Sequence, residues 1–182
     1  SATYFSERTL REIFFPAFKA SIQEGKAWSI MAAYNSISGI PSSSNRWLLT
    51  DVLRGEWGFD GFVVSDYGSV WGLQGAHRVA ETLAEAGKLA LEAGLDVELP
   101  HAVCFPELVK MIKEGKVSED TLDKAVERVL KGKYWLGLFD NPFADLDTAR
   151  QICDCDEHRE LALKVAERCI VLLKNNGILP LP

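Results

Sequence analysis

Short apolar runs alternate with amphipathic segments along most of the chain, and this alternation predicts the order of its elements. The apolar runs are bounded by Gly, Pro or polar residues, as expected of buried strands. The amphipathic segments repeat apolar residues three and four positions apart, which is the spacing of a helix with one buried face. The pattern predicts strands at residues 28–33, 62–64 and 95–99.

Helices are expected before, between and after these strands, and several carry capping signals. Ser6, Asn45 and Ser118 are placed as N-caps, and Gly94 is placed as the glycine that ends a helix. Pro16 lies inside the first helical pattern and should kink or split that helix. Loops are expected where Gly, Ser and Pro cluster, at residues 35–44 and 67–79. The expected helices cover residues 7–24, 46–56, 80–93, 105–114, 119–136 and 157–174.

Strands that alternate with helices predict an α/β fold with a parallel sheet and right-handed crossovers. The strands lie about 33 residues apart, which fits the βα units of a (β/α)8 TIM-type barrel. Three such units do not complete a barrel of about 250 residues. No glycine-rich phosphate-binding fingerprint follows a strand, and this argues against a dinucleotide-binding domain.

The composition is that of an ordinary globular protein, with 47% hydrophobic and 25% charged residues. The net charge is −6 and the Lys and Arg residues are scattered. A nucleic-acid partner would require a basic stripe, so none is expected. No apolar run approaches the ~20 residues of a membrane span, so no membrane partner is expected. The sequence indicates no cellular compartment.

The four cysteines and three histidines show no spacing typical of metal ligands. Cys153 and Cys155 flank a single residue, whereas Cys104 and Cys169 lie far apart in the sequence. A disulfide scaffold would need a higher density of cysteines. We therefore expect reduced cysteines that behave as small hydrophobic residues, and no metal site.

The segment 61–68, Gly-Phe-Val-Val-Ser-Asp-Tyr-Gly, is an apolar run that ends abruptly in a carboxylate. Asp66 therefore stands at the carboxyl end of a predicted strand, where the catalytic groups of α/β proteins collect. The alternative is that Asp66 caps the next helix or turn, because Asp before Gly and Ser is common in turns.

Four segments, in register along nearly the whole chain, resemble glycoside hydrolase family 3, the family of β-glucosidases and β-xylosidases. Residues 29–35 read Ser-Ile-Met-Ala-Ala-Tyr-Asn and resemble the family's M-x-x-Tyr-Asn segment. Residues 49–66 end in its Gly-Phe-Val-Val-Ser-Asp motif, and residues 91–100 look like its last barrel strand. Residues 170–180 resemble the entry to its second domain.

The resemblance implies roles for particular residues. Asp66 matches the family's catalytic nucleophile, and Met31 and Tyr34 match residues that line the sugar subsite. Tyr67, directly after the nucleophile, is expected to line the same pocket. Two alternatives remain open: Tyr34 as a half-buried strand-end residue with a satisfied hydroxyl, and Met31 as filling of the core.

A retaining glycosidase needs two carboxyl groups, about 5–5.5 Å apart. One attacks the anomeric carbon, and the other protonates the leaving oxygen and later deprotonates water. In the family the second group comes from the second domain, expected after residue 182, and further sugar-binding residues are expected before residue 1. Glu98 is the best local substitute; its alternative role is a hydrogen-bonded strand-end carboxylate. Glu56 and Asp60 are expected to be solvated turn residues at the opposite end.

The sequence thus predicts the last three βα units of a partial barrel (residues 1–138), a linker (139–156) and the start of a second α/β domain with its leading helix (157–182). The resemblance implies a retaining exo-acting β-glycosidase that removes terminal non-reducing β-D-glucosyl or xylosyl residues from carbohydrates without a cofactor. A non-catalytic half-barrel that binds sugar or a partner is the alternative, and a complete small α/β protein is a third possibility. Open strand edges predict self-association.

Overall fold

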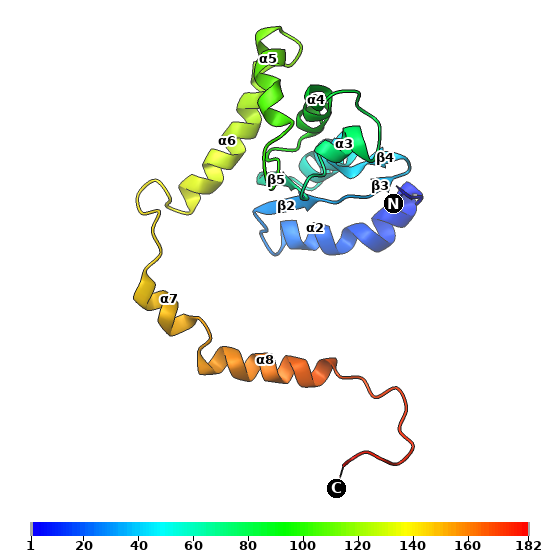
Figure 1. Ribbon diagram of the computed structural model, residues 1–182, viewed down its shortest axis with the longest axis vertical. Coiled ribbons are helices and arrows are strands. Elements are labelled where there is room, and N and C mark those ends of the chain that lie inside the picture. Colours follow the sequence, from blue (N-terminus) through cyan, green and yellow to red (C-terminus); the bar gives the residue numbers. More distant parts are fainter. Residues whose placement is uncertain (1, 182) are drawn as a thin grey trace. The chain divides into compact units, whose positions relative to one another are not determined.

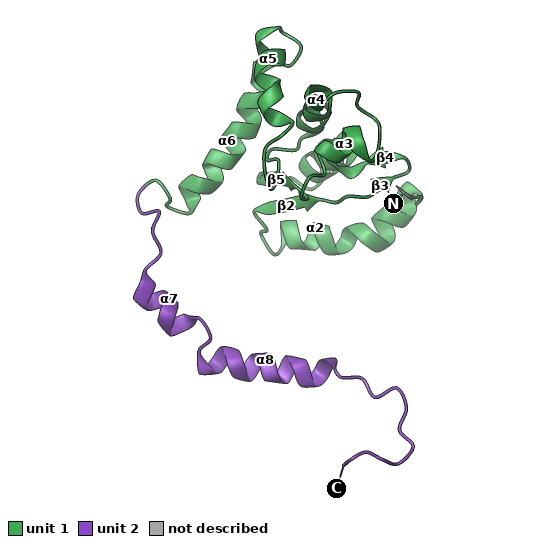
Figure 2. Ribbon diagram, in the orientation of Figure 1, with its two compact units in different colours: residues 1–139 green, residues 140–182 purple. Residues whose placement is uncertain are grey.

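The computed structural model describes residues 2–181, and the chain divides into two compact units (Figure 2). Unit 1 covers residues 1–139 and contains the strands and the apolar core of the described residues. Unit 2 covers residues 140–182 and contains two helices joined by a short turn. Each unit is described by itself.

A parallel pair of strands forms the centre of unit 1 (Figure 1). Strand β2 (Ser29–Ala32) pairs along its whole length with β5 (Phe62–Ser65). A single parallel bridge joins Val64 to Val97. Three chain segments therefore run in the same direction, and their carboxyl ends meet at one edge of the sheet.

The third predicted strand, residues 95–99, is wrong as a regular strand, because it forms only a single bridge. Side chains take over part of the hydrogen bonding that a strand ladder would provide. The amide of Val63 donates to the Asp96 carboxylate at 2.7 Å. At the other end the amide of Leu99 donates to the Ser65 hydroxyl at 2.9 Å. The alternation of apolar and polar residues does not show that side chains replace backbone groups in these hydrogen bonds.

Helices from four parts of the chain pack their apolar sides on these strands and share one core. Val52, Val63 and Leu73 are fully buried there. Full burial of such a side chain contributes about 1.5–3 kcal/mol, so this core is the main stabilising feature of unit 1. The helices are α2 (Phe15–Gln23), the π-helical η3 (Trp47–Glu56), α3 (Trp71–Gly75) and α4 (Leu83–Ala93).

The first predicted helix is split, as its proline suggested. It consists of α1 (Glu7–Thr9), the π-helical η1 (Leu10–Phe14) and α2. Pro16 lies in the first turn of α2, where its missing amide is tolerated. The predicted N-cap Ser6 is confirmed, because its hydroxyl accepts a hydrogen bond from the amide of Thr9 at 3.1 Å.

Most of the other predicted helix ends are also confirmed. The Asn45 side chain accepts a hydrogen bond from the amide of Leu48 at 3.1 Å, at the start of η3. Gly94 ends α4 with a φ of 107°, a left-handed conformation that glycine adopts at little cost. Ser118 occupies the N-cap position of α6 (Glu119–Trp135), although its hydroxyl makes no capping hydrogen bond.

Two segments that were predicted as loops contain regular structure. Residues 35–44 include a short hairpin, residues 67–79 include α3, and both segments are too short and too rich in Gly and Ser to show a period. A short 3-10 helix, η2, follows the hairpin. The short elements around this hairpin are β1 (Ala2–Thr3), β3 (Ser36–Ile37), β4 (Ile40–Pro41) and η2 (Ser42–Ser44), and the three strands form a sheet in the order β1-β3-β4.

Helix α6 lies against β5 and α4, and it follows η4 (Phe105–Glu107) and α5 (Leu108–Lys113). A glycine permits its close approach: a Cβ added at Gly132 would lie 2.9 Å from the indole nitrogen of Trp28. One turn further on, the Trp135 ring stacks on Trp28 with a centroid distance of 4.0 Å. This contact secures the last helix of unit 1 to the amino end of β2.

Unit 2 differs from its sequence prediction in two places. Helix α7 (Leu146–Ile152) lies inside the segment predicted as a linker, and Asp145 caps it. Helix α8 (Asp156–Cys169) ends five residues before the predicted position 174. The β-branched residues Ile170 and Val171 have low helix propensity, which accounts for the early end.

No helix within residues 2–181 is both long and apolar enough to cross a membrane. The same residues contain no group of three or more His, Cys, Asp or Glu side chains placed to hold a metal ion. All four cysteines are free thiols, and Cys104 is buried.

A candidate active site at the carboxyl ends of the strands

Asp66 directly follows β5, and backbone hydrogen bonds fix it at the end of that strand. Its amide donates to the carbonyl of Ala32 at 3.1 Å, and its carbonyl accepts from the amide of Ser69 at 3.0 Å. The carboxylate accepts one hydrogen bond, from the amide of Tyr67 at 2.7 Å, and the residue is partly buried. The backbone is thus held by neighbouring segments, while the carboxylate itself is not fully buried.

The structure excludes Asp66 as a cap of the next helix but agrees with a role in the next turn. Helix α3 has Val70 at its N-cap position and no side-chain capping bond. The Asp66 carboxylate accepts a hydrogen bond from the amide of Tyr67, the first residue of the turn that follows the strand.

The turn after Asp66 is tied to two neighbouring segments. The amide of Gly68, whose φ is 72°, donates to the carbonyl of Leu99 at 2.8 Å. The hydroxyls of Ser69 and Ser43 share a buried hydrogen bond of 2.7 Å. These contacts restrict the backbone that carries the carboxylate without covering the carboxylate itself.

Tyr34, which follows β2, reaches across to the segment after Asp66. Its hydroxyl donates to the carbonyl of Tyr67 at 2.7 Å. Partial burial of the hydroxyl and the adjacent Asp66 carboxylate raise the pKa of Tyr34. The phenol therefore stays protonated and can act as a hydrogen-bond donor at neutral pH.

The structure brings Tyr34, Asp66 and Tyr67 together, while Met31 lies further back on β2, opposite Val64. The side chains of Tyr34, Tyr67 and Met31 are 53%, 65% and 56% exposed. Tyr34 is satisfied through its hydroxyl but only half-buried, and Met31 is not a member of either buried core. Met31 lines an apolar groove beside β2, whose lining includes neither Tyr34 nor Tyr67.

The carboxylate of Glu98, the local candidate for the acid, is occupied by hydrogen bonds from backbone amides. Its carboxylate accepts hydrogen bonds from the amides of Val103, Cys104 and Phe105 at 2.9–3.0 Å, and the residue is 6% exposed. The alternative role as a hydrogen-bonded strand-end carboxylate is confirmed. Burial and the adjacent Glu98 charge also raise the pKa of the Cys104 thiol to about 12.

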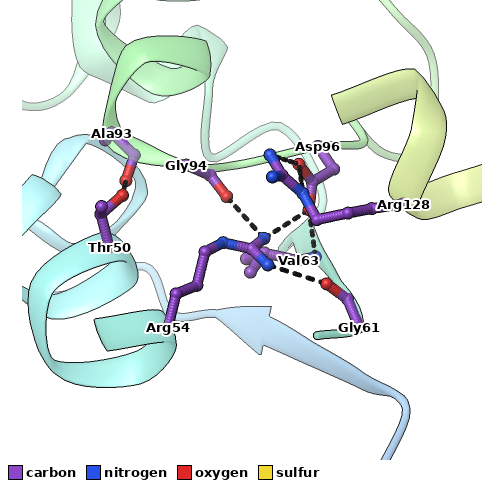
Figure 3. A network of polar contacts seen from close by, with 8 residues as sticks. All are labelled: Thr50, Arg54, Gly61, Val63, Ala93, Gly94, Asp96 and Arg128. Atoms are coloured by element: carbon purple, nitrogen blue, oxygen red, sulfur yellow. Dashed lines mark hydrogen bonds and ion pairs between the residues drawn. The ribbon is translucent and has the colours of Figure 1, made fainter. Parts of the chain in front are cut away.

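A second aspartate, Asp96, lies near the amino end of β5 in a network that the sequence did not indicate (Figure 3). One carboxylate oxygen accepts from Arg54 and from the amide of Val63, both at 2.7 Å. The other accepts from two nitrogens of Arg128 at 3.0 and 2.8 Å. The Asp96 side chain is 0% exposed. A buried carboxylate is stable only with such compensation.

Arg54 extends this network to the backbone of two further segments. Its guanidinium donates to the carbonyls of Gly61 at 2.8 Å and Gly94 at 3.2 Å (Figure 3). Burial lowers the pKa of Arg54, an effect that the charge of Asp96 opposes. The cluster therefore joins η3, β5, the end of α4 and α6 at the side of the sheet away from Asp66.

Glu56 and Asp60 are exposed, as expected of solvated residues, but Glu56 is the last residue of η3 rather than part of a turn, and both form ion pairs. Glu56 accepts two hydrogen bonds from Arg11, at 2.6 and 2.7 Å, and this cation lowers the pKa of Glu56. Asp60 pairs with Lys131. Both carboxylates are exposed and lie before β5, so the prediction that they stand apart from the strand ends with Asp66 is confirmed.

Comparison with known proteins gives a consistent result. Residues 1–131 match the family described as Glycosyl hydrolase family 3 N terminal domain. The Beta-xylosidase of Formosa agariphila is 41% identical over 184 residues, covering 97% of this chain and 25% of that protein. The Thermostable beta-glucosidase B of Acetivibrio thermocellus is 40% identical over 184 residues, covering 98% and 21%.

Solved structures agree. A beta-glucosidase from Listeria innocua in complex with glucose has a TM-score of 0.89 and 41% identity, covering 100% of this chain and 25% of that chain. A b-glucosidase from Erythrobacter marinus has a TM-score of 0.92 and 38% identity, covering 100% and 24%. The chain spans about a quarter of the length of the relatives that it matches. With its residues 1–131 matching the N-terminal domain, the chain belongs to glycosyl hydrolase family 3.

Proposed function

We propose that this chain is the part of a retaining exo-acting β-glycosidase that carries the catalytic nucleophile, Asp66. The substrate is a carbohydrate with a terminal non-reducing β-D-glucosyl or xylosyl residue. The names of the relatives and the glucose complex of the Listeria innocua enzyme support this substrate class. The observation that carries the proposal is a partly exposed carboxylate on a fixed strand end, beside two tyrosines.

The proposed reaction has two displacements. An Asp66 oxygen attacks the anomeric carbon, and the bond to the leaving oxygen breaks as a general acid protonates that oxygen. Water then cleaves the glycosyl ester and restores the Asp66 carboxylate. Tyr34 holds its proton and donates a hydrogen bond near the reacting carboxylate. Tyr67 and Met31 line the sugar subsite.

The proposal includes the architecture: the last three βα units of a (β/α)8 barrel at residues 1–138, a linker at 139–156 and the start of a second domain at 157–182. Two apolar grooves in unit 1 support an incomplete barrel. One, of about 460 Å³, lies beside β2 and is lined by residues such as Phe14, Phe18 and Ile30. The other, of about 290 Å³, lies beside the bridge at Val97.

These grooves border the two outer segments of the parallel ladder, where a further strand on each side would cover them. We therefore expect the isolated 182-residue chain to self-associate through these edges. Sedimentation velocity should show concentration-dependent association. A chain that sediments as a monomer and melts in one cooperative transition would contradict this part of the proposal.

A second candidate function applies to the chain by itself. Because the amides of the 103–105 turn occupy the Glu98 carboxylate, no free acid partner for Asp66 is evident among the described residues. This favours a half-barrel that binds sugar and hydrolyses nothing alone. In the proposed enzyme, the acid comes from a part of the protein outside this chain.

The test compares Asp66→Asn with the wild type in the complete protein that contains this chain, on aryl β-glucosides and β-xylosides. We expect kcat to fall by about 10⁴-fold or more, as for other nucleophile replacements. Asp60→Asn is the matched control at the opposite end of the same strand and should keep full activity, because its ion pair is exposed. Full activity in Asp66→Asn would overturn the proposal.

A further inference from the structure

His77 lies beyond α3, at the far end of the segment that follows Asp66. Its Nε2 atom is 2.9 Å from the carbonyl oxygen of Tyr34. Since a carbonyl oxygen only accepts, Nε2 must carry a proton and donate. The amide of His77 donates to the carbonyl of Gly72 at 2.8 Å, which fixes the histidine backbone to α3. The segment that follows Asp66 therefore places the His77 imidazole beside Tyr34, at the carboxyl end of β2.

Tyr34 is held by this segment at two points. His77 binds its backbone carbonyl, and its hydroxyl binds the carbonyl of Tyr67 at 2.7 Å. Both contacts come from the segment of residues 67–77 that follows Asp66. Tyr67, at its start, binds the Tyr34 hydroxyl, and His77, at its end, binds the Tyr34 carbonyl. Because Tyr34 is 53% exposed and belongs to neither core, packing alone does not fix its ring. The adjacent Asn35 is held by Ser42 and Thr3, and the two hydrogen bonds to Tyr34 itself add a restraint at its carbonyl and at its hydroxyl.

We propose that His77 is a positioning residue, which holds Tyr34 in the orientation that places its hydroxyl beside Asp66. The effect of His77 on catalysis rests on the proposed function, whereas its contact with Tyr34 does not depend on that function. The hydroxyl has one proton and two acceptors within reach, the Tyr67 carbonyl and the Asp66 carboxylate. Without His77 the Tyr34 peptide can rotate, and the hydroxyl leaves both. Small misplacements of this kind at a reacting centre are costly.

The kinetic test uses the complete protein that contains this chain. His77→Leu keeps the volume but removes the donor, and kcat should fall about fivefold to tenfold with KM nearly unchanged, the loss expected for one hydrogen bond. His77→Gln retains a side-chain N–H at a similar reach and should recover most of the loss. A loss in His77→Leu below twofold, or equal losses in both variants, would overturn the proposal.

A double-variant comparison separates positioning from general stabilisation. If His77 acts through Tyr34, adding His77→Leu to Tyr34→Phe should cause no further loss of kcat, because the hydroxyl to be positioned is already gone. Two independent residues would instead show losses that multiply. Multiplying losses would overturn the proposal.

A measurement without catalysis keeps this inference separate from the proposed function. The ionisation of Tyr34 is followed by NMR of ¹³C-labelled tyrosine rings, with Tyr34→Phe to assign the signal. In His77→Leu the pKa of Tyr34 should fall towards its ordinary value, while in His77→Gln it should stay raised. An unchanged pKa in His77→Leu would overturn the inference even in an active enzyme. If the wild type hydrolyses nothing, the proposed function fails and this titration alone decides on His77.

Discussion

Asp66 and Asp96 lie on neighbouring parallel segments, and the structure treats them in opposite ways. Asp66 follows the carboxyl end of β5, is partly exposed and accepts one hydrogen bond from an adjacent amide. Asp96 lies beside the amino end of β5, and its side chain is 0% exposed. Its carboxylate accepts hydrogen bonds from two arginines and one backbone amide. An aspartate carboxylate thus has one hydrogen-bond donor at one end of the sheet, whereas at the other end both carboxylate oxygens accept hydrogen bonds.

The difference separates chemistry from stability. A carboxylate that attacks a substrate needs an accessible oxygen and a fixed backbone, and the proposed role of Asp66 agrees with its partly exposed side chain and its backbone hydrogen bonds. A carboxylate that is enclosed by guanidinium groups has no free oxygen, and removing it leaves buried cations. The proposed barrel architecture would account for this contrast, because in barrels the carboxyl ends of the strands carry the active site and the amino ends serve stability.

The largest expected effect on stability comes from Asp96, beside the amino end of β5. Asp96→Asn should lower the free energy of unfolding by about 3–5 kcal/mol, because two partly buried guanidinium groups lose a fully buried counter-charge. Urea unfolding followed by circular dichroism measures this loss. Asp66→Asn, at the open end, should change stability by less than about 1 kcal/mol. Equal losses in the two variants would remove the contrast.

Arg128→Met sharpens the same contrast within the network. The Met side chain keeps much of the apolar stem but removes two hydrogen bonds to Asp96, so the loss should be about 1.5–3 kcal/mol. The comparison variant is Lys124→Met on the same helix, whose ion pair with Asp120 is exposed and should contribute less than about 1 kcal/mol. A larger loss in Lys124→Met would contradict the assigned role of Asp96.

The N-cap of α4 provides an intermediate test. Thr82→Ala removes the hydroxyl that accepts from the amide of Glu85 and should cost about 1 kcal/mol in urea unfolding. Thr82→Ser retains the hydroxyl and should stay close to the wild type. A loss of equal size in both variants would show that the hydroxyl is not the stabilising group.

The smallest effect concerns reactivity rather than stability. The pKa of the Cys104 thiol is raised to about 12 by burial and by Glu98, so the thiol stays protonated and shielded in mildly alkaline buffer. Maleimide labelling in native protein should modify the exposed Cys153 and Cys169 and spare Cys104. Rapid labelling of Cys104 would show that the turn around Glu98 opens readily.

The sequence was most informative where the signal was local. Apolar runs located the segments at 28–33 and 62–64, and the carboxylate that ends the second run pointed to Asp66, whereas Tyr34 was indicated only by the family resemblance. Capping residues such as Ser6 and Gly94 were found because a cap acts on amides or carbonyls within one turn of itself.

The network and the positioning histidine were missed because their contacts join distant parts of the chain. Arg54 and Asp96 are 42 residues apart, Arg128 and Asp96 are 32 apart, and His77 and Tyr34 are 43 apart. The only local signal was a carboxylate within an apolar run, at Asp96. The irregular third strand was missed for the same reason, since Asp96 and Ser65 side chains replace ladder bonds.

The most direct test of the central claim traps the nucleophile covalently. The complete protein that contains this chain is incubated with a fluorosugar glycoside whose glycosyl-enzyme ester hydrolyses slowly, and the labelled peptide is mapped by mass spectrometry. We predict that the label is on Asp66 and is absent in Asp66→Asn. A label on Glu98 or Asp96, or full hydrolytic activity with no covalent label on any carboxylate, would contradict the account.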